Sequence, residues 1–98
     1  MQTSYPNIRD GRLALAVAGT PQKLVTTNTP CKKVEITAFT GNTGFIAIGD
    51  KTVVVATATR RGTPLMAGQT LTLYISDLSV VYADAEVAGE GVTFLYFL

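Results

Sequence analysis

Apolar and polar residues alternate in short segments along most of this chain. Residues 33–38 alternate strictly, so Val34, Ile36 and Ala38 fall on one face and polar residues on the other. A repeat of two residues is typical of β-strands that bury one face. Similar apolar or alternating segments recur between clusters of turn residues. Together they predict strands over 13–18, 33–38, 45–48, 52–57, 70–75, 80–87 and 92–98.

Turn-forming residues separate these segments. The clearest turn is Gly41-Asn42-Thr43-Gly44, and others are expected at 49–51, 60–64, 67–69 and 88–91. Leu65 and Met66 are expected to fill the core from a bend, and Ser76 or Asp77 to cap a single helical turn. Short strands joined by close turns predict an all-β, antiparallel β-sandwich that forms one domain over residues 13–98.

The two ends of the chain depart from this pattern. Residues 1–12 mix polar groups with Pro and Gly, which predicts a flexible N-terminal arm that orders on a partner, or a frayed terminus. The last segment, 92–98, has apolar residues on both faces, as in a central strand or in one buried at a subunit contact. The sequence leaves both alternatives open. The candidate assembly contacts at the two ends are Tyr5, Ile8, Arg9, Phe94, Tyr96, Phe97 and Leu98.

Charged residues make up 15% of the chain, against roughly 25% in an average globular protein. This composition favours burial of surface against other subunits, although a small sandwich with a Thr, Ser and Gly surface is an alternative. The net charge of +1 divides into +3 over residues 1–49 (5 − 2) and −2 over residues 50–98 (3 − 5). That asymmetry is far from a nucleic-acid-binding surface. No segment approaches the ~20 apolar residues that cross a bilayer, so we expect neither nucleic acid nor membrane as a partner.

Groups suited to catalysis are few. The chain has no histidine, the commonest side chain for proton transfer and metal binding near neutral pH. Cys31 has no second cysteine to pair with in the chain, and we expect it to be a small buried side chain. Asp84 and Glu86 lie two residues apart on a predicted strand, where a shared solvated face is the simplest interpretation. We therefore expect no enzyme activity and no catalytic, cofactor-binding or metal-binding residues.

Several segments resemble small virion proteins encoded by phages and by phage-like particles such as gene transfer agents. The resemblance covers about residues 24–97 and rests on 31–38, 41–44, 46–49, 63–70, 77–78, 82–85 and 89–96. It implies a β-sandwich or jelly-roll-like module that acts as a head decoration, the base of a head spike or fibre, or a tail-fibre attachment piece. It also implies capsid or fibre proteins as partners, and a place on the virion surface after synthesis in the bacterial cytoplasm.

Two functions therefore remain. The first is a structural component of a phage-like particle that docks on the capsid as a closed homo-oligomer, a trimer or, slightly favoured, a pentamer. The second is a carbohydrate- or receptor-binding module for attachment to a bacterial surface. An exposed aromatic platform beside amides would favour sugar binding, and a flat apolar face would favour assembly. The residues that could form a sugar site are Tyr74, Tyr82, Asn42 and Gln69.

Overall fold

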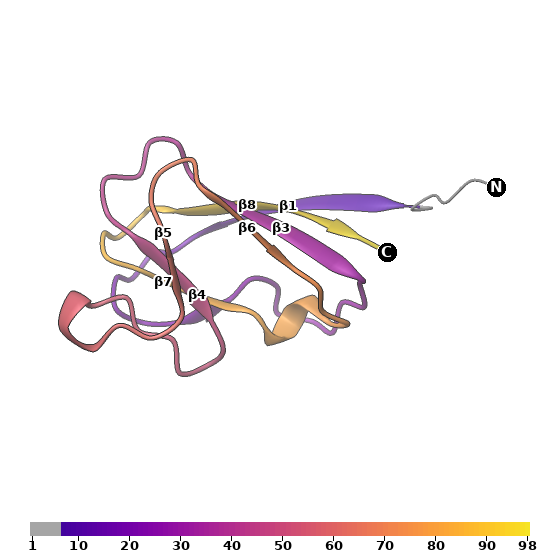
Figure 1. The fold of residues 1–98 in the computed structure, drawn as a ribbon, viewed down its shortest axis with the longest axis horizontal. Coiled ribbons are helices and arrows are strands. Elements are labelled where there is room, and N and C mark those ends of the chain that lie inside the picture. Colours follow the sequence, from indigo (N-terminus) through magenta and orange to yellow (C-terminus); the bar gives the residue numbers. More distant parts are fainter. Residues whose placement is uncertain (1–6) are drawn as a thin grey trace.

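The computed structural model describes residues 7–98, which fold into two four-stranded antiparallel sheets packed as a sandwich (Figure 1). The predicted all-β sandwich is confirmed. The strands are β1 Ile8–Ala14, β2 Gln22–Lys23, β3 Lys33–Ala38, β4 Ile46–Gly49, β5 Thr63–Leu65, β6 Thr70–Leu73, β7 Tyr82–Ala85 and β8 Gly91–Phe97. Two short 3-10 helices, η1 Thr57–Thr59 and η2 Leu78–Val80, lie in connections between strands.

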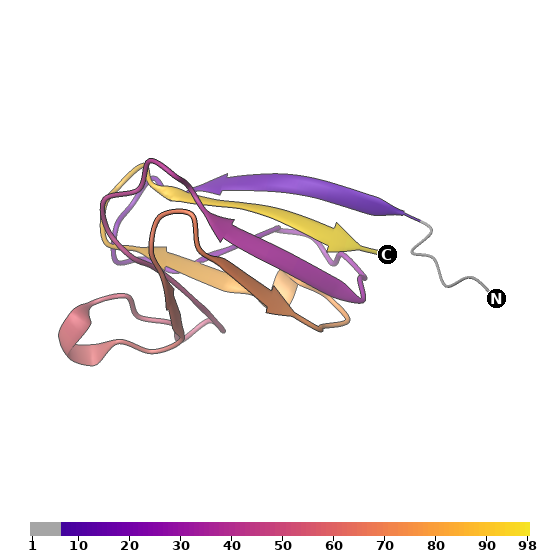
Figure 2. The same ribbon diagram turned by 45° about the horizontal axis from the view of Figure 1, so that its top comes forward.

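The strand order gives the sandwich its topology. One sheet runs β1-β8-β3-β6 and the other β2-β7-β4-β5, and Figure 2 shows the two layers. Each strand of the first half of the chain thus lies beside one of the second half, with β1 beside β8, β2 beside β7, β3 beside β6 and β4 beside β5. A long antiparallel hairpin rolled into two layers gives this order, which is the jelly-roll-like arrangement that we expected.

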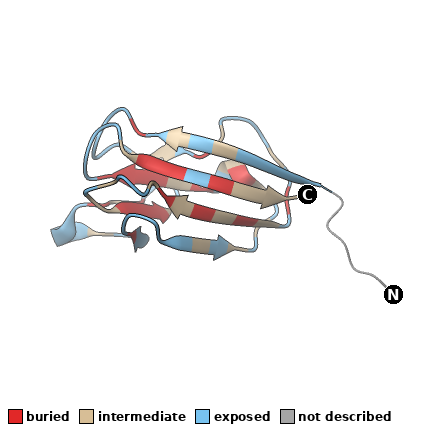
Figure 3. Cartoon of the chain, turned by 90° about the horizontal axis from the view of Figure 1, so that it is seen from above, coloured by how far each residue is buried: buried red, intermediate tan, exposed pale blue. Residues whose placement is uncertain are grey.

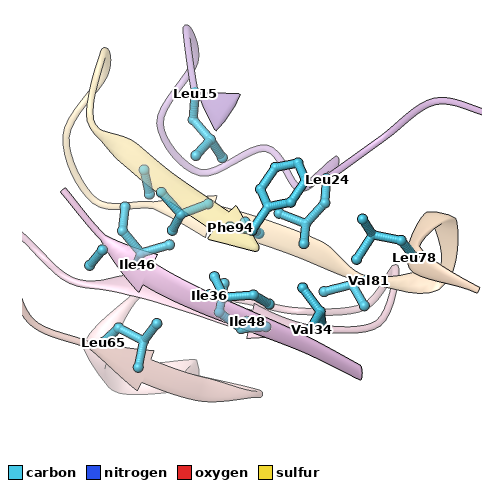
Figure 4. Close-up of a cluster of buried hydrophobic side chains, with 14 of the residues drawn as sticks. Leu15, Leu24, Val34, Ile36, Ile46, Ile48, Leu65, Leu78, Val81 and Phe94 are labelled. Carbon is cyan, nitrogen blue, oxygen red and sulfur yellow. The ribbon is translucent and has the colours of Figure 1, made fainter. Parts of the chain in front are cut away.

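The core lies between the inward faces of the two sheets. In β3, Val34, Ile36 and Ala38 are buried, as their alternation predicted. Their neighbours in β8 include Phe94 and Val92, which are buried on the same face. Figure 4 shows how these side chains meet those of the second sheet and its connections. The other large core residues are Leu15, Leu24, Ile46, Ile48, Leu65, Leu78 and Val81.

The last strand, β8, is central, because it lies between β1 and β3. Phe94 is only 5% exposed and packs in the core, so its ring offers almost no surface to a partner. The structure thus removes Phe94 from the surface at which we expected assembly contacts. The opposite face of β8 carries Leu95 and Phe97, which are half-buried.

The N-terminal segment enters the sandwich earlier than we predicted. Residues 8–12 were assigned to the arm, but they form most of β1, which pairs with β8 along its whole length. The sequence hides this strand because Gly11 occupies an inward position, where the ring of Phe94 fills the space that a side chain would need. Tyr5 and the rest of the predicted arm, residues 1–6, lie outside the described residues.

Residues 52–57 do not form the predicted strand. Only Val54 pairs, in an isolated bridge with Arg61, and residues 50–62 form a long connection instead. Val53 and Val55 are buried and pack against Ala47 on the outward face of the second sheet. The apolar pattern was real, but these residues cover a sheet and do not extend one.

The prediction that Leu65 and Met66 fill the core was correct only for Leu65. Leu65 fills the core at 4% exposure, whereas Met66 is 55% exposed. The Met66 N–H donates to Oε1 of Gln69 at 2.7 Å, and the Gln69 N–H donates to the Met66 carbonyl at 3.0 Å. These two bonds close a tight turn in which the Met66 side chain points away from the core.

Candidate functional site

The outward face of the first sheet carries a row of apolar and aromatic residues at the end where β8 stops. Strand register places Ile8, Phe97 and Lys33 side by side across β1, β8 and β3, with Tyr74 beside Lys33. The Lys33 ammonium lies 4.9 Å from the Phe97 ring centre and 5.9 Å from that of Tyr74. Ile8 is 54% and Tyr74 77% exposed. We call these four residues the aromatic row.

Two further rows continue this face along the strands. The next row contains Asp10, Leu95 and Glu35, and the Glu35 carboxylate lies 3.4 Å from the Lys33 ammonium. The row after it is rich in threonine and contains Arg12, Thr93, Thr37 and Thr70. The face therefore changes from apolar to charged to hydroxylic over a few residues, so a partner could recognise both its position and its direction.

An open groove of about 550 Å³ lies at the same end of the sandwich, between the strand ends and the loop before β3. Arg9, Tyr96 and Leu98 line one side of it, and Asn28, Pro30 and Lys32 line the other. We call this the end groove. It combines apolar walls with two basic side chains, which suits an extended segment that carries acidic groups.

Asp77 holds the loop wall of this groove in place. Its carboxylate accepts hydrogen bonds from the backbone N–H groups of Thr29 and Ser79, each at 3.0 Å, and from the Ser79 hydroxyl at 2.9 Å. The bonds from Thr29 and then Ser79 lower the pKa of Asp77 below its ordinary value, because they stabilise the ionised carboxylate. Asp77 also caps η2, which is one of the two caps that the sequence left open, Ser76 and Asp77.

The structure gathers most of the candidate assembly contacts at this end. Ile8 and Phe97 belong to the aromatic row, and Arg9, Tyr96 and Leu98 to the end groove. Sequence reasoning missed the contributions of Lys33, Tyr74 and the loop at 28–32. Lys33 and Tyr74 could have been found only from the pairing of β3 with its neighbours, which no local pattern encodes.

The four residues considered for a sugar site are not brought together. Tyr74 follows β6 of the first sheet, and Tyr82 begins β7 of the second. The Asn42 amide exchanges hydrogen bonds with the backbone of Gly91, and the Gln69 carbonyl accepts from Met66. The amides thus stabilise turns, and Tyr74 has a lysine beside it instead.

Asp84 and Glu86 do not share a solvated face, so that expectation was wrong. Asp84 is 2% exposed, and one of its oxygens accepts a hydrogen bond from the Val55 N–H at 3.0 Å. Glu86 is exposed, accepts from the Phe45 N–H at 2.7 Å and lies 3.7 Å from the Arg60 guanidinium. Both carboxylates anchor the connection at 50–62 and its surroundings to the second sheet.

Cys31 is buried, as predicted, and its thiol lies 3.5 Å from the Ile75 carbonyl. Burial, followed by the nearby charge of Asp77, raises the pKa of this thiol. Among residues 7–98, no three His, Cys, Asp or Glu side chains are grouped so that they could hold a metal ion. No helix in the described part of the chain is long and apolar enough to cross a membrane.

Comparison of the chain with models of protein families, with curated proteins and with solved structures finds no match.

Proposed function

We propose that the chain is a structural component of a phage-like particle, made in the bacterial cytoplasm and docked on the particle surface as a decoration protein or as a spike or fibre base. Its contact surface would be the aromatic row together with the end groove. The observation that carries this proposal is the convergence of Ile8, Arg9, Tyr96, Phe97 and Leu98 at one end of the sandwich.

The exposure of the aromatic row supports docking. Ile8 and Tyr74 are each more than half exposed and lie in a single row with Phe97. An apolar group of this kind at one end of a small domain is typical of a protein contact surface. Covering it would remove apolar area from water, which is the main driving force of association.

Electrostatics indicate the chemistry of the partner surface. Arg9 and Lys32 line the end groove, and the carboxylate of Asp77 is occupied by its hydrogen bonds to the loop. Lys33 already has an acidic partner in Glu35. We therefore expect carboxylate groups on the capsid or fibre protein that receives this end. Charge complementarity of that kind acts mainly on the rate of association and on its dependence on salt.

The test is to find the chain on particles and then to perturb the proposed surface. Particles released by the producing bacterium would be purified on a density gradient and searched for the chain by mass spectrometry. Purified Tyr74→Asp should bind particles that lack the chain more weakly than the native protein does. Val80→Asp is the matched control, since Val80 is an apolar side chain that is 55% exposed but lies in η2, outside the aromatic row and the end groove. Absence from particles, or equal binding of both variants, would refute the proposal.

The alternative, a carbohydrate- or receptor-binding module, is supported by one observation. The Tyr74 ring is 77% exposed, as a platform for stacking a sugar would be. Screening the purified chain against an array of bacterial surface glycans tests this function. Binding that is lost in Tyr74→Ala would favour it, and absence of binding at high protein concentration would refute it.

A further inference from the structure

Strand β1 has one edge without a neighbour. It pairs with β8 on one side only and borders its sheet (Figure 3). The Leu98 N–H donates to the Asn7 carbonyl at 3.1 Å, and the Leu15 N–H donates to the Glu90 carbonyl at 2.9 Å. Because hydrogen bonding alternates along an antiparallel pair, odd-numbered residues of β1 bond to β8. The residues whose backbone N–H and C=O groups point to the free edge are Ile8, Asp10, Arg12 and Ala14.

This edge carries two opposite charges without ionic partners. The Asp10 carboxylate takes part in no hydrogen bond or ion pair among residues 7–98. The Arg12 guanidinium lies 4.4 Å from the Phe39 ring centre and has no acidic partner in the same part of the chain. A guanidinium stacked on a ring keeps N–H donors at its rim. Both side chains project from the outward face of the sheet, next to the edge.

We propose that this edge pairs antiparallel with β1 of a second copy of the chain, in the register that sets Asp10 opposite Arg12. Only registers that match even-numbered residues with one another can form the backbone bonds. The two neighbouring registers set Asp10 opposite Asp10 or Arg12 opposite Arg12, and like charges directly opposite destabilise a pair of strands. The register between them places Asp10 of each copy opposite Arg12 of the other. This gives two ion pairs, one on each side of the two-fold axis that relates the copies.

The contact would join two sandwiches through one continuous sheet. Gly11 would face Gly11 at the axis, and Ile8 would face Ala14 at each end. Four matched pairs would supply up to about eight backbone hydrogen bonds. The axis is two-fold, unlike that of the expected trimer or pentamer, and the contact does not depend on the proposed particle function.

Charge reversal tests the ion pairs. Light scattering over a series of concentrations should approach a dimer of 20.8 kDa, twice 10.4 kDa. Asp10→Arg and Arg12→Asp should each weaken dimerisation roughly ten- to a hundredfold. A one-to-one mixture of the two variants, and the double variant in one chain, should each restore it. Lys51→Asp changes the charge as Arg12→Asp does, at an exposed turn, and should have no effect. A monomer at all concentrations, or a trimer or pentamer insensitive to these changes, would overturn the proposal.

Disulfide trapping tests the register. In a Cys31→Ala background, a chain with both Ile8→Cys and Ala14→Cys should crosslink into a dimer under mild oxidation. These positions are six residues apart on one strand, about 20 Å, which is too far for a bond within one chain. Asp10→Cys alone would crosslink in the register that sets residue 10 opposite residue 10. Arg12→Cys alone would crosslink in the register that sets residue 12 opposite residue 12. Faster trapping in either single variant, or no trapping in the double variant, would contradict the proposed pairing.

Discussion

Replacing Gly11 with alanine should destabilise the protein, although glycine is ordinarily a poor residue for a strand. Gly11 faces inward opposite Phe94, and a methyl group there would overlap the far end of the Phe94 ring. The ring has little room to move, because Phe94 is 5% exposed and packs beside Tyr96. Alanine would normally gain about 0.5–1 kcal/mol in a strand, whereas overpacking costs about 1–3 kcal/mol. We expect a net loss of roughly 1–2 kcal/mol.

A double-mutant cycle isolates this contact from other effects. Phe94→Ala alone should cost about 3–5 kcal/mol, as for a buried aromatic residue. In that background the obstacle is gone, so Gly11→Ala should stabilise the protein by about 0.5–1 kcal/mol. The change of sign corresponds to a coupling energy of roughly 2 kcal/mol between the two positions. For a domain of this size, 1 kcal/mol shifts the melting temperature by about 4–8 °C.

Urea unfolding followed by circular dichroism would measure the cycle. Gly41→Ala is the matched control, because a methyl group at Gly41 would meet nothing within 4 Å. It should change the free energy of unfolding by less than about 0.5 kcal/mol. If Gly11→Ala had the same effect with and without the Phe94 ring, the register of β1 on β8 would be incorrect. The proposed pairing of β1 edges would then lose its basis.

Three further outcomes follow from the polar and thiol contacts. Because its hydrogen bonds lower the pKa of Asp77, this carboxyl adds stability above the ordinary aspartate pKa, and that stability is lost as the pH falls through the lower folded-state value. Asp77→Asn should therefore lose less stability than the native protein between pH 5 and pH 2, measured by urea unfolding. Asp84→Ala should cost about 1–3 kcal/mol in thermal unfolding, since it leaves the buried N–H of Val55 without its acceptor. Cys31 should react with a thiol reagent more slowly than an exposed thiol, because it is only 8% exposed and its pKa is raised; a rate close to that of an exposed thiol would contradict its burial.

Strands with one buried face could be predicted from the sequence because the pattern is local. In a strand, Val34, Ile36 and Ala38 lie on the same face, and three apolar side chains on one face indicate that this face is buried in the core. The cap at Asp77 is equally local, since its acceptor lies two residues before the N–H of Ser79. Signals of this kind need no knowledge of the strand order.

Features that depend on distant partners were missed. β1 lacks alternation because Gly11 leaves its inward position to the ring of Phe94, which is 83 residues later. Val53 and Val55 look like strand residues, but the Val55 N–H is taken by a carboxylate, so no strand ladder forms there. The aromatic row arises from the register of four strands. Each case is decided by tertiary packing, which overrides local preference.

The two outward faces of the sandwich differ in how far the chain itself covers them. On the second sheet, the connection at 50–62 supplies its own cover: Val53 and Val55 pack over Ala47, and the Arg60 guanidinium lies 4.6 Å from the Phe45 ring centre. No comparable connection packs over the first sheet among the described residues, and Tyr74 there is 77% exposed. This cover buries Val53, Val55 and Ala47, which would otherwise be exposed on the second sheet. Two exposed large apolar side chains therefore remain on the outward face of the first sheet, Ile8 at its β1 edge and Tyr74 at its β6 edge. A partner bound to the first sheet would cover its outward face, as the connection at 50–62 covers that of the second sheet.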